Sequence, residues 1–364
     1  MKRYYFAYGS NLSEEDRAAY SPPCPPGALK KVSVAFLPDR QLGFTRRSTT
    51  RGGGVLDVVP SRGCVVAGVL FEATEAGWAW LDKKEGSPRH YRHLDTVVLT
   101  ADGRMVPVRT YEVVDRSLIF VSPADAYLDI CRKAWEDHGL DLTALEAAAK
   151  NEPASPLTSF FVYGTLMRGE SRHGVFAPQD VECMLLAKAF GRLVDCGAYP
   201  AMRPDPEARA MVQGDLIRVG AAALLRLIDA LDDIEGFRGY GVDGSLFERR
   251  LTEVDVGEGR TRLAWVYMMD QPPDDAVRID GNWRVRSGRW RSFLQEIVSI
   301  HCPGGEELSL ARAIIGSQVR WAPGDGEAEA RALVPFADAL DRGALSERTL
   351  AQTSGRWVAK LDDP

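Results

Sequence analysis

Cysteine and histidine motifs that would bind a metal or form disulfides are missing from this chain of 364 residues. Its six cysteines are scattered without a CxxC pair, and of its five histidines only His90 and His93 lie close together. Neither cysteine nor carboxylate ligands recur around that pair at the spacing typical of metal sites. We therefore predict no metal, no cofactor and no disulfide framework.

Long apolar runs and an excess of positive charge are missing as well. No run of 18 apolar residues is present, so we expect no membrane-spanning helix. A strand is predicted so close to the N-terminus that it leaves no room for a signal peptide. The formal net charge of -6, with acidic and basic residues interleaved, argues against a nucleic-acid groove. We expect a folded, cytoplasmic protein without nucleic-acid or membrane partners.

A short strand followed by a tight turn occurs twice, over residues 5–12 and 160–166. In each copy an aromatic and β-branched run ends at a glycine followed by a hydroxyl residue. Glycine lets the backbone approach a ligand closely, and successive N–H groups beyond a strand can hold an anion. An ordinary turn after a strand is the alternative for either copy alone. The repetition favours an anion-binding turn.

A second motif repeats in the same order. Leu81-Asp82-Lys83-Lys84-Glu85-Gly86 in the first half corresponds to Leu231-Asp232-Asp233-Ile234-Glu235-Gly236 in the second. The motif tyrosine precedes the glutamate by 77 residues in one half and 72 in the other. Two ordered features at similar spacing indicate a tandem duplication, and the length of the chain agrees with two or more domains.

Each glutamate ends a predicted amphipathic helix, over residues 72–85 and 221–235, and each is followed by a glycine suited to cap it. The helix macrodipole is negative at that end and destabilises a carboxylate there by roughly 0.3 to 1 kcal/mol. This effect favours the protonated form, as an acid/base residue near neutral pH requires. A solvated glutamate at a helix end is the alternative, and the matching positions in the two copies favour function.

The remaining chain is divided by composition. Residues 46–54 form a basic, glycine-rich loop that could steer an anionic substrate, although a solvated mobile loop is the preferred interpretation. The proline-containing segment 151–156 is typical of a linker. We place one domain at 1–150, a second at 157–300 and a C-terminal extension of helical composition at 301–364. Further strands are predicted at 32–36, 41–44, 55–59, 64–71, 96–99, 106–114, 189–194, 211–218, 251–256 and 263–269, and further helices at 123–136 and 141–149.

At the repeated motifs the sequence resembles the gamma-glutamylcyclotransferase superfamily. Its members carry Tyr-Gly-Ser/Thr-x-Leu after the first strand and a Glu in an L-D-x-x-E-G context at a helix end. The first half resembles the gamma-glutamylcyclotransferase branch proper, whereas residues after the linker are more similar to the gamma-glutamylamine cyclotransferase branch. The resemblance extends over about residues 3–300. It implies an α+β fold of two tandem domains, each a small curled barrel of mixed or antiparallel strands with flanking helices.

The resemblance also implies a reaction. The α-amine of a gamma-glutamyl amide or peptide attacks its own side-chain carbonyl, which releases 5-oxoproline and a free amine or amino acid, a lyase or acyltransferase type of chemistry. Ring closure is intramolecular, so orientation can supply about 7 to 11 kcal/mol of the barrier reduction. The resemblance implies that Glu85 and Glu235, which match the family's glutamate, are the general acid/base residues. The residues expected to bind substrate are Tyr8, Gly9, Ser10, Asn11, Leu12 and Tyr91 in the first half, and Tyr163, Gly164, Thr165 and Leu166 in the second.

One position departs from the family pattern. A tyrosine usually follows the Glu where the next strand begins, and Tyr91 occupies that place in the first half, whereas Phe247 occupies it in the second. Two interpretations of the second half therefore stand: a second catalytic centre, or a non-catalytic gamma-glutamyl-binding or interaction module. No Ser-His-Asp or Cys-His arrangement supports an unrelated hydrolase or amidotransferase. The released amine and the oligomeric state are not encoded in any pattern we can interpret.

Overall fold

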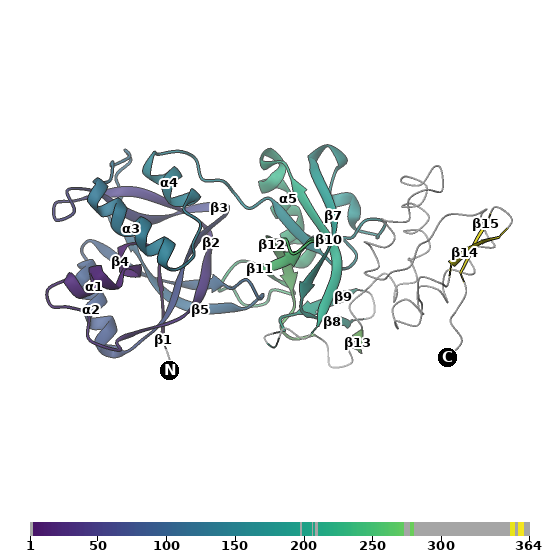
Figure 1. Cartoon of the computed structure of the whole chain (residues 1–364), viewed down its shortest axis with the longest axis horizontal. Coiled ribbons are helices and arrows are strands. Elements are labelled where there is room, and N and C mark those ends of the chain that lie inside the picture. The colour runs from purple at the N-terminus through teal and green to yellow at the C-terminus, as the bar shows by residue number, and fades with distance from the viewer. Residues whose placement is uncertain are drawn as a thin grey trace. The chain divides into compact units, whose positions relative to one another are not determined.

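The computed structural model describes residues 3–196, 199–205, 207, 210–272, 277–279, 350–353 and 356–359. The chain divides into two compact units, Met1–Thr158 with Gly220–Thr252, and Ser159–Val219 with Glu253–Pro364. The described part contains two closed five-stranded barrels, with strand orders β1-β3-β2-β4-β5 and β10-β6-β12-β11-β7. The fold is thus the predicted pair of barrels (Figure 1).

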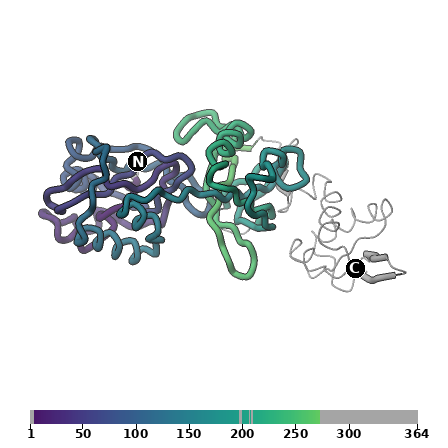
Figure 2. Tube along the Cα trace, turned by 90° about the horizontal axis from the view of Figure 1, so that it is seen from above, coloured from purple at the N-terminus to yellow at the C-terminus, as the bar shows by residue number. Residues whose placement is uncertain are grey.

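The first unit contains the first barrel and most of the helices. Figure 2 shows the part of this unit up to Thr158 in purple and blue and its second segment, Gly220–Thr252, in green. Its elements are β1 (Arg3–Ala7), the short 3-10 turn η1 (Ser10–Leu12), α1 (Glu14–Ala19), β2 (Leu29–Ser48), β3 (Gly53–Ala73), α2 (Glu75–Glu85), β4 (Tyr91–Leu99), β5 (Met105–Val113), α3 (Asp125–Asp137) and α4 (Thr143–Ala149), joined by α5 (Ala221–Glu235) and the start of β11 (Glu248–Asp255).

The long hairpin of β2 and β3 differs from the sequence prediction, which divided it into four short strands and a loop. Pairing runs from Leu29↔Ala73 to Ser48↔Gly53 and continues through a register shift around Asp39, whose φ is 54°. Such bulges bend a strand around a barrel without ending it. The predicted basic loop is consequently the tip of this hairpin, with Arg46 and Arg47 inside β2.

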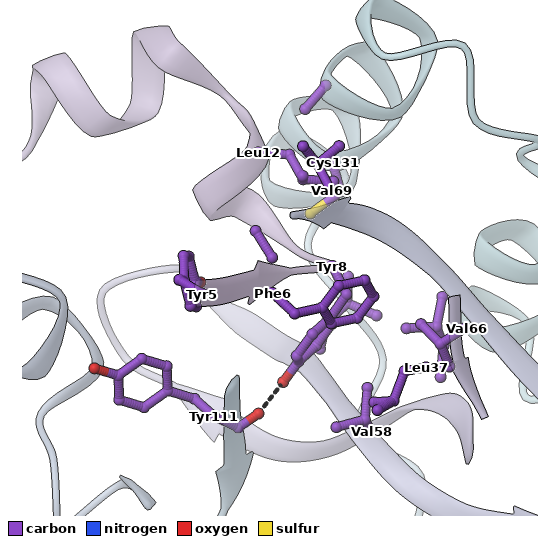
Figure 3. Close-up of a cluster of buried hydrophobic side chains, with 14 of the residues drawn as sticks. Tyr5, Phe6, Tyr8, Leu12, Leu37, Val58, Val66, Val69, Tyr111 and Cys131 are labelled. Atoms are coloured by element: carbon purple, nitrogen blue, oxygen red, sulfur yellow. Dashed lines mark hydrogen bonds between the residues drawn. The ribbon is translucent and has the colours of Figure 1, made fainter. Parts of the chain in front are cut away.

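Glycine allows the barrel to close. β1 pairs antiparallel with β3 and parallel with β5, and Gly68 of β3 lies against the last residue of β1. A Cβ on Gly68 would stand 2.3 Å from the carbonyl oxygen of Ala7, closer than real Cβ contacts allow. Figure 3 shows the buried cluster inside this barrel, including Phe6, Tyr8 and Tyr111.

The helices begin and end at recognisable caps. The Thr74 hydroxyl accepts a hydrogen bond from the Gly77 N–H at 3.1 Å, so α2 starts three residues later than predicted, after β3 has run to Ala73. Gly86 and Gly236 cap α2 and α5 in the left-handed conformation, with φ of 61° and 64°. Both predicted glycine caps are confirmed. None of the helices in the described ranges is long and apolar enough to cross a membrane.

The second barrel repeats the plan of the first. Its own apolar core includes Phe161, Val212 and Val266. The hydroxyl of Tyr163 donates to the carbonyl of Tyr267 at 2.7 Å, as Tyr8 donates to Tyr111 at 2.8 Å in the first unit. The remaining strands are β6 (Ser159–Val162), β7 (Val181–Phe190), β8 (Arg192–Asp195), β9 (Pro200–Arg203), β10 (Met211–Val219), β12 (Thr261–Met268) and β13 (Val277–Ile279), with the 3-10 turns η2 (His173–Val175) and η3 (Pro178–Asp180).

The predicted helical extension lies outside the described residues, apart from a hairpin of β14 (Leu350–Thr353) and β15 (Arg356–Ala359).

Candidate functional site

A cavity of about 710 Å³ opens in the first half, between the turn after β1, the end of α2 and the tip of the β2–β3 hairpin. Its volume is in the usual range for small-molecule sites. Its lining includes six of the predicted site residues, namely Tyr8, Gly9, Ser10, Asn11, Glu85 and Tyr91. Leu12, predicted to bind substrate, is instead buried in the core with only 2% of its surface exposed.

The side chain of Asn11 connects the turn to the glutamate. Its Nδ2 donates to Glu85 Oε1 at 2.6 Å and to the Tyr5 hydroxyl at 2.8 Å. The 3-10 turn that carries Asn11 closes through a bond from the Leu12 N–H to the Gly9 carbonyl at 2.9 Å. The first N–H groups of such a turn have no partner within it. Two motifs that lie 74 residues apart in the chain therefore meet through one amide.

Glycine is not required by crowding at Gly9. A Cβ there would lie 3.6 Å from Leu56, an ordinary contact, and the backbone angles of Gly9 are φ -120° and ψ -145°. An alanine side chain would therefore fit at this position in ordinary contact with its neighbours.

Burial raises the pKa of the Glu85 carboxyl above its ordinary value. Lys84, the hydrogen bond from Asn11 and Arg51 oppose this shift. The upward direction of this pKa shift agrees with the expectation from the helix macrodipole, but its leading physical cause is the loss of solvation of the carboxyl. A carboxyl with a raised pKa can both take and return a proton near neutral pH.

Two of the tyrosine hydroxyls around the cavity donate hydrogen bonds to backbone carbonyls. Tyr8 donates to the Tyr111 carbonyl, and Tyr91 donates to the Leu56 carbonyl at 2.8 Å. Burial raises the pKa of Tyr8 and of Tyr91 well above the ordinary value, so both stay protonated. Trp135 of α3 in turn donates its indole N–H to the Tyr8 carbonyl at 2.9 Å. These residues hold the wall of the cavity in place.

A cluster of charges at the cavity was not singled out in the sequence analysis. Asp16 Oδ2 accepts from Lys84 Nζ at 2.7 Å and from Arg51 Nη2 at 2.8 Å. Burial lowers the pKa of Lys84, which its ion pair with Asp16 opposes. The basic stretch around Arg51 was visible in the sequence, whereas no local pattern marks Asp16 or Lys84. All three residues line the cavity.

The aspartate of the repeated L-D-x-x-E-G motif also has a defined role in packing. Asp82 Oδ1 accepts from the Tyr111 hydroxyl at 2.7 Å and lies 2.6 Å from His93 Nε2. The rings of His93 and Tyr111 meet edge to face, with centroids 5.2 Å apart. Because Tyr111 lines the cavity, this cluster fixes one of its walls to the helix that ends in Glu85.

The predicted residues of the second copy are placed in both units. Tyr163, Gly164, Thr165 and Leu166 follow β6 in the second unit, where the Met167 N–H donates to the Gly164 carbonyl at 2.9 Å, as in the first turn. A Cβ on Gly164 would stand 2.5 Å from the Pro200 ring. Glu235 is the last residue of α5 in the first unit and is 8% exposed.

The Leu166 position distinguishes the two turns, because Leu166 corresponds to Asn11. Two further correspondences follow from the strand pairing and the motif order: Phe160 matches Tyr5, and Phe247 matches Tyr91. Each substitution replaces a polar group with an apolar one. Within the described ranges, no group of three or more His, Cys, Asp or Glu side chains is arranged to hold a metal ion.

Several solved structures are similar to parts of this chain. A structure named gamma-glutamyl cyclotransferase is 27% identical and aligns over 43% of this chain and 90% of its own, with a TM-score of 0.37. An uncharacterized protein from Homo sapiens is 28% identical over 42% of this chain and 90% of its own, also with a TM-score of 0.37. YkqA from Bacillus subtilis is 16% identical over 75% of this chain and 85% of its own, with a TM-score of 0.32.

Among curated proteins, no sequence matches this chain. The model of the family described as gamma-glutamyl cyclotransferase, AIG2-like, matches residues 5–136 and again residues 160–292. Both matches include a strand, its glycine turn and a helix that ends in glutamate. The chain therefore belongs to the gamma-glutamyl cyclotransferase, AIG2-like family, and carries two copies of its domain.

Proposed function

We propose that the first half of the chain is a gamma-glutamyl cyclotransferase with Glu85 as its general acid/base residue. The observation that carries this proposal is the hydrogen bond between Asn11 and Glu85, which joins the repeated turn to the repeated glutamate inside one cavity. The family assignment supports the same reaction class.

In the proposed reaction, the α-nitrogen of the substrate bonds to its own γ-carbonyl carbon. Ionised Glu85 takes one proton from the α-ammonium so that the amine can attack, and it passes that proton to the leaving nitrogen as the bond between this nitrogen and the γ-carbon breaks. The ring nitrogen loses a second proton as the lactam forms, and this proton is also taken up by the released amine, which departs as an ammonium ion. The products are 5-oxoproline and that ammonium ion, so atoms and protons balance. The N–H groups of the turn at Gly9 and Ser10 are proposed to hold the substrate α-carboxylate or the developing oxyanion, for which one donor contributes about 3 kcal/mol.

The geometry also suggests how the substrate conformer is selected. Tyr8, Tyr91 and Tyr127 line the cavity, and the hydroxyl of each is hydrogen-bonded to a backbone group of the protein. Rigid walls of this kind restrict the gamma-glutamyl side chain to folded conformers. Because ring closure depends mainly on bringing nitrogen and carbon together, that restriction is the principal contribution expected from the protein.

The test is release of 5-oxoproline from gamma-glutamyl amino acids, amines and glutathione, measured by mass spectrometry. Glu85→Gln should abolish turnover while leaving the fold intact, because Gln keeps the size of the side chain and its ability to accept from Asn11. Glu235→Gln is the matched control, since it makes the same change at the end of α5. Absence of product from the wild-type chain with every substrate would overturn the proposal.

A second candidate function applies to the second half, which we propose as a gamma-glutamyl-binding module without turnover. The loss of polar groups at Leu166, Phe160 and Phe247 favours it. Calorimetric titration of the full-length Glu85→Gln chain with an uncleaved gamma-glutamyl ligand should then show two sites per chain. A single site would contradict binding by the second half. The cytoplasm stays the predicted location, and cell fractionation tests it.

A further inference from the structure

The charged side chains that line the cavity are unequal in number. Cations exceed carboxylates by two when all are ionised. This contrasts with the chain as a whole, whose formal net charge is -6. His90 also lines the cavity, and desolvation, Arg46 and Arg89 lower its pKa, which disfavours its positively charged form. The charged lining residues are Arg46, Arg47, Arg51, Lys84, Asp16 and Glu85.

The surplus of positive charge can be assigned to particular residues. Asp16 is shared by Lys84 and Arg51, whose ion pairs are formed within the protein. Among the residues that the structure describes, no carboxylate pairs with Arg46 or Arg47. The guanidinium of Arg46 instead lies 6.0 Å from the centre of the Tyr91 ring. The two adjacent arginines are thus the cations available to a ligand.

The two arginines lie at the end of β2, next to the tip of the hairpin. Side chains alternate between the faces of a regular strand. Here the pairing of β2 with β3 shifts between Phe44 and Arg46, after which Arg46 pairs with Val55 and Arg47 with Gly54. β2 ends at Ser48, and every residue from Arg46 to Arg51 lines the cavity. The hairpin tip as a whole therefore brings both arginines to one cavity.

The substrate head group cannot supply the missing negative charge. A gamma-glutamyl group carries one α-carboxylate and one α-ammonium, which cancel. We propose, on the basis of the cyclotransferase function above, that the leaving group of the first-half substrate carries two negative charges, which pair with Arg46 and Arg47. Two carboxylates of an acidic amino acid or one phosphate monoester supply this charge. Arginine is suited to both because its planar guanidinium binds either group through two hydrogen bonds.

The experiment uses two pairs of substrates whose members differ in the negative charge of the leaving group. Gamma-glutamyl-glutamate and gamma-glutamyl-glutamine form one pair, and gamma-glutamyl-phosphoethanolamine and gamma-glutamyl-ethanolamine form the other. For the full-length wild-type chain, the more negative member of at least one pair should have a kcat/KM about two- to fivefold higher, as for a partly exposed charge pair. Added salt should reduce the preference. The favoured pair identifies carboxylate or phosphate as the source of charge.

Variants connect the preference to the two arginines. Arg47→Gln and Arg46→Gln should each lower kcat/KM for the more negative substrate of the favoured pair by a larger factor than for its less negative partner. Arg104→Gln is the matched control, because Arg104 pairs with Asp102 and does not line the cavity. Equal kcat/KM within both pairs, or a preference that survives both substitutions, would overturn this inference while leaving the cyclotransferase function standing. No 5-oxoproline from any substrate would instead remove the function itself.

Discussion

Asn11→Leu tests the connection between the turn and the acid, because it copies the Leu166 of the second half. The substitution removes a 2.6 Å hydrogen bond to Glu85. A hydrogen bond to a charged group contributes about 1.5 to 3 kcal/mol, which corresponds to a factor of about 10 to 150 in an equilibrium. Since the bond from Asn11 lowers the pKa of Glu85, its loss should raise that pKa further and reduce the ionised fraction.

The assay is the pH dependence of kcat/KM for 5-oxoproline release. In the Asn11→Leu variant the acid limb should move upward by about one to two pH units, because more alkaline solution is needed to ionise the base. Tyr5→Phe is the matched control: it removes the other acceptor of the same amide and leaves the bond to Glu85. An acid limb that stays in place for Asn11→Leu, or that moves equally for Tyr5→Phe, would refute the reasoning.

Three predictions concern stability. Glu85→Gln should stabilise the chain relative to the wild type by an amount that grows between about pH 4 and pH 8. The pKa of Glu85 is raised in the folded chain, so ionising this carboxyl costs folding free energy as the pH rises. Urea unfolding of both proteins at the two pH values measures the difference in stability, and a difference that does not change with pH would contradict the prediction. Gly68→Ala should destabilise the folded chain by about 1 to 3 kcal/mol because the new Cβ would collide with the backbone of β1, whereas Gly9→Ala should be tolerated. Equal urea unfolding midpoints for the two variants would rule this out. Trp135→Phe should lower the free energy of unfolding by about 1 to 3 kcal/mol because it leaves the buried Tyr8 carbonyl without its hydrogen bond. Urea unfolding measures this loss, and an unchanged midpoint would count against the prediction.

Local features of this protein were predictable because contiguous residues encode them. Both helix ends at Glu85 and Glu235 followed from apolar periodicity and a capping glycine, and the structure confirms both caps. The duplication followed from two motifs in the same order, and the two matches to the family confirm it. The long β2–β3 hairpin was divided wrongly, because Asp39 and the basic tip resemble turns when their partner strand is unknown.

The sequence by itself determined the duplication, the two glutamates at helix ends and the turns after the two strands. Each of these features depends on neighbours a few residues away. Only the tertiary structure decided which groups share a cavity. Asp16 meets Lys84 across 68 residues and Arg51 across 35, and Asn11 meets Glu85 across 74. Such contacts depend on how the barrel closes and where its turns and helix ends are brought together. No local pattern contains that information, because the free energy of these pairs arises from burial that exists only after folding.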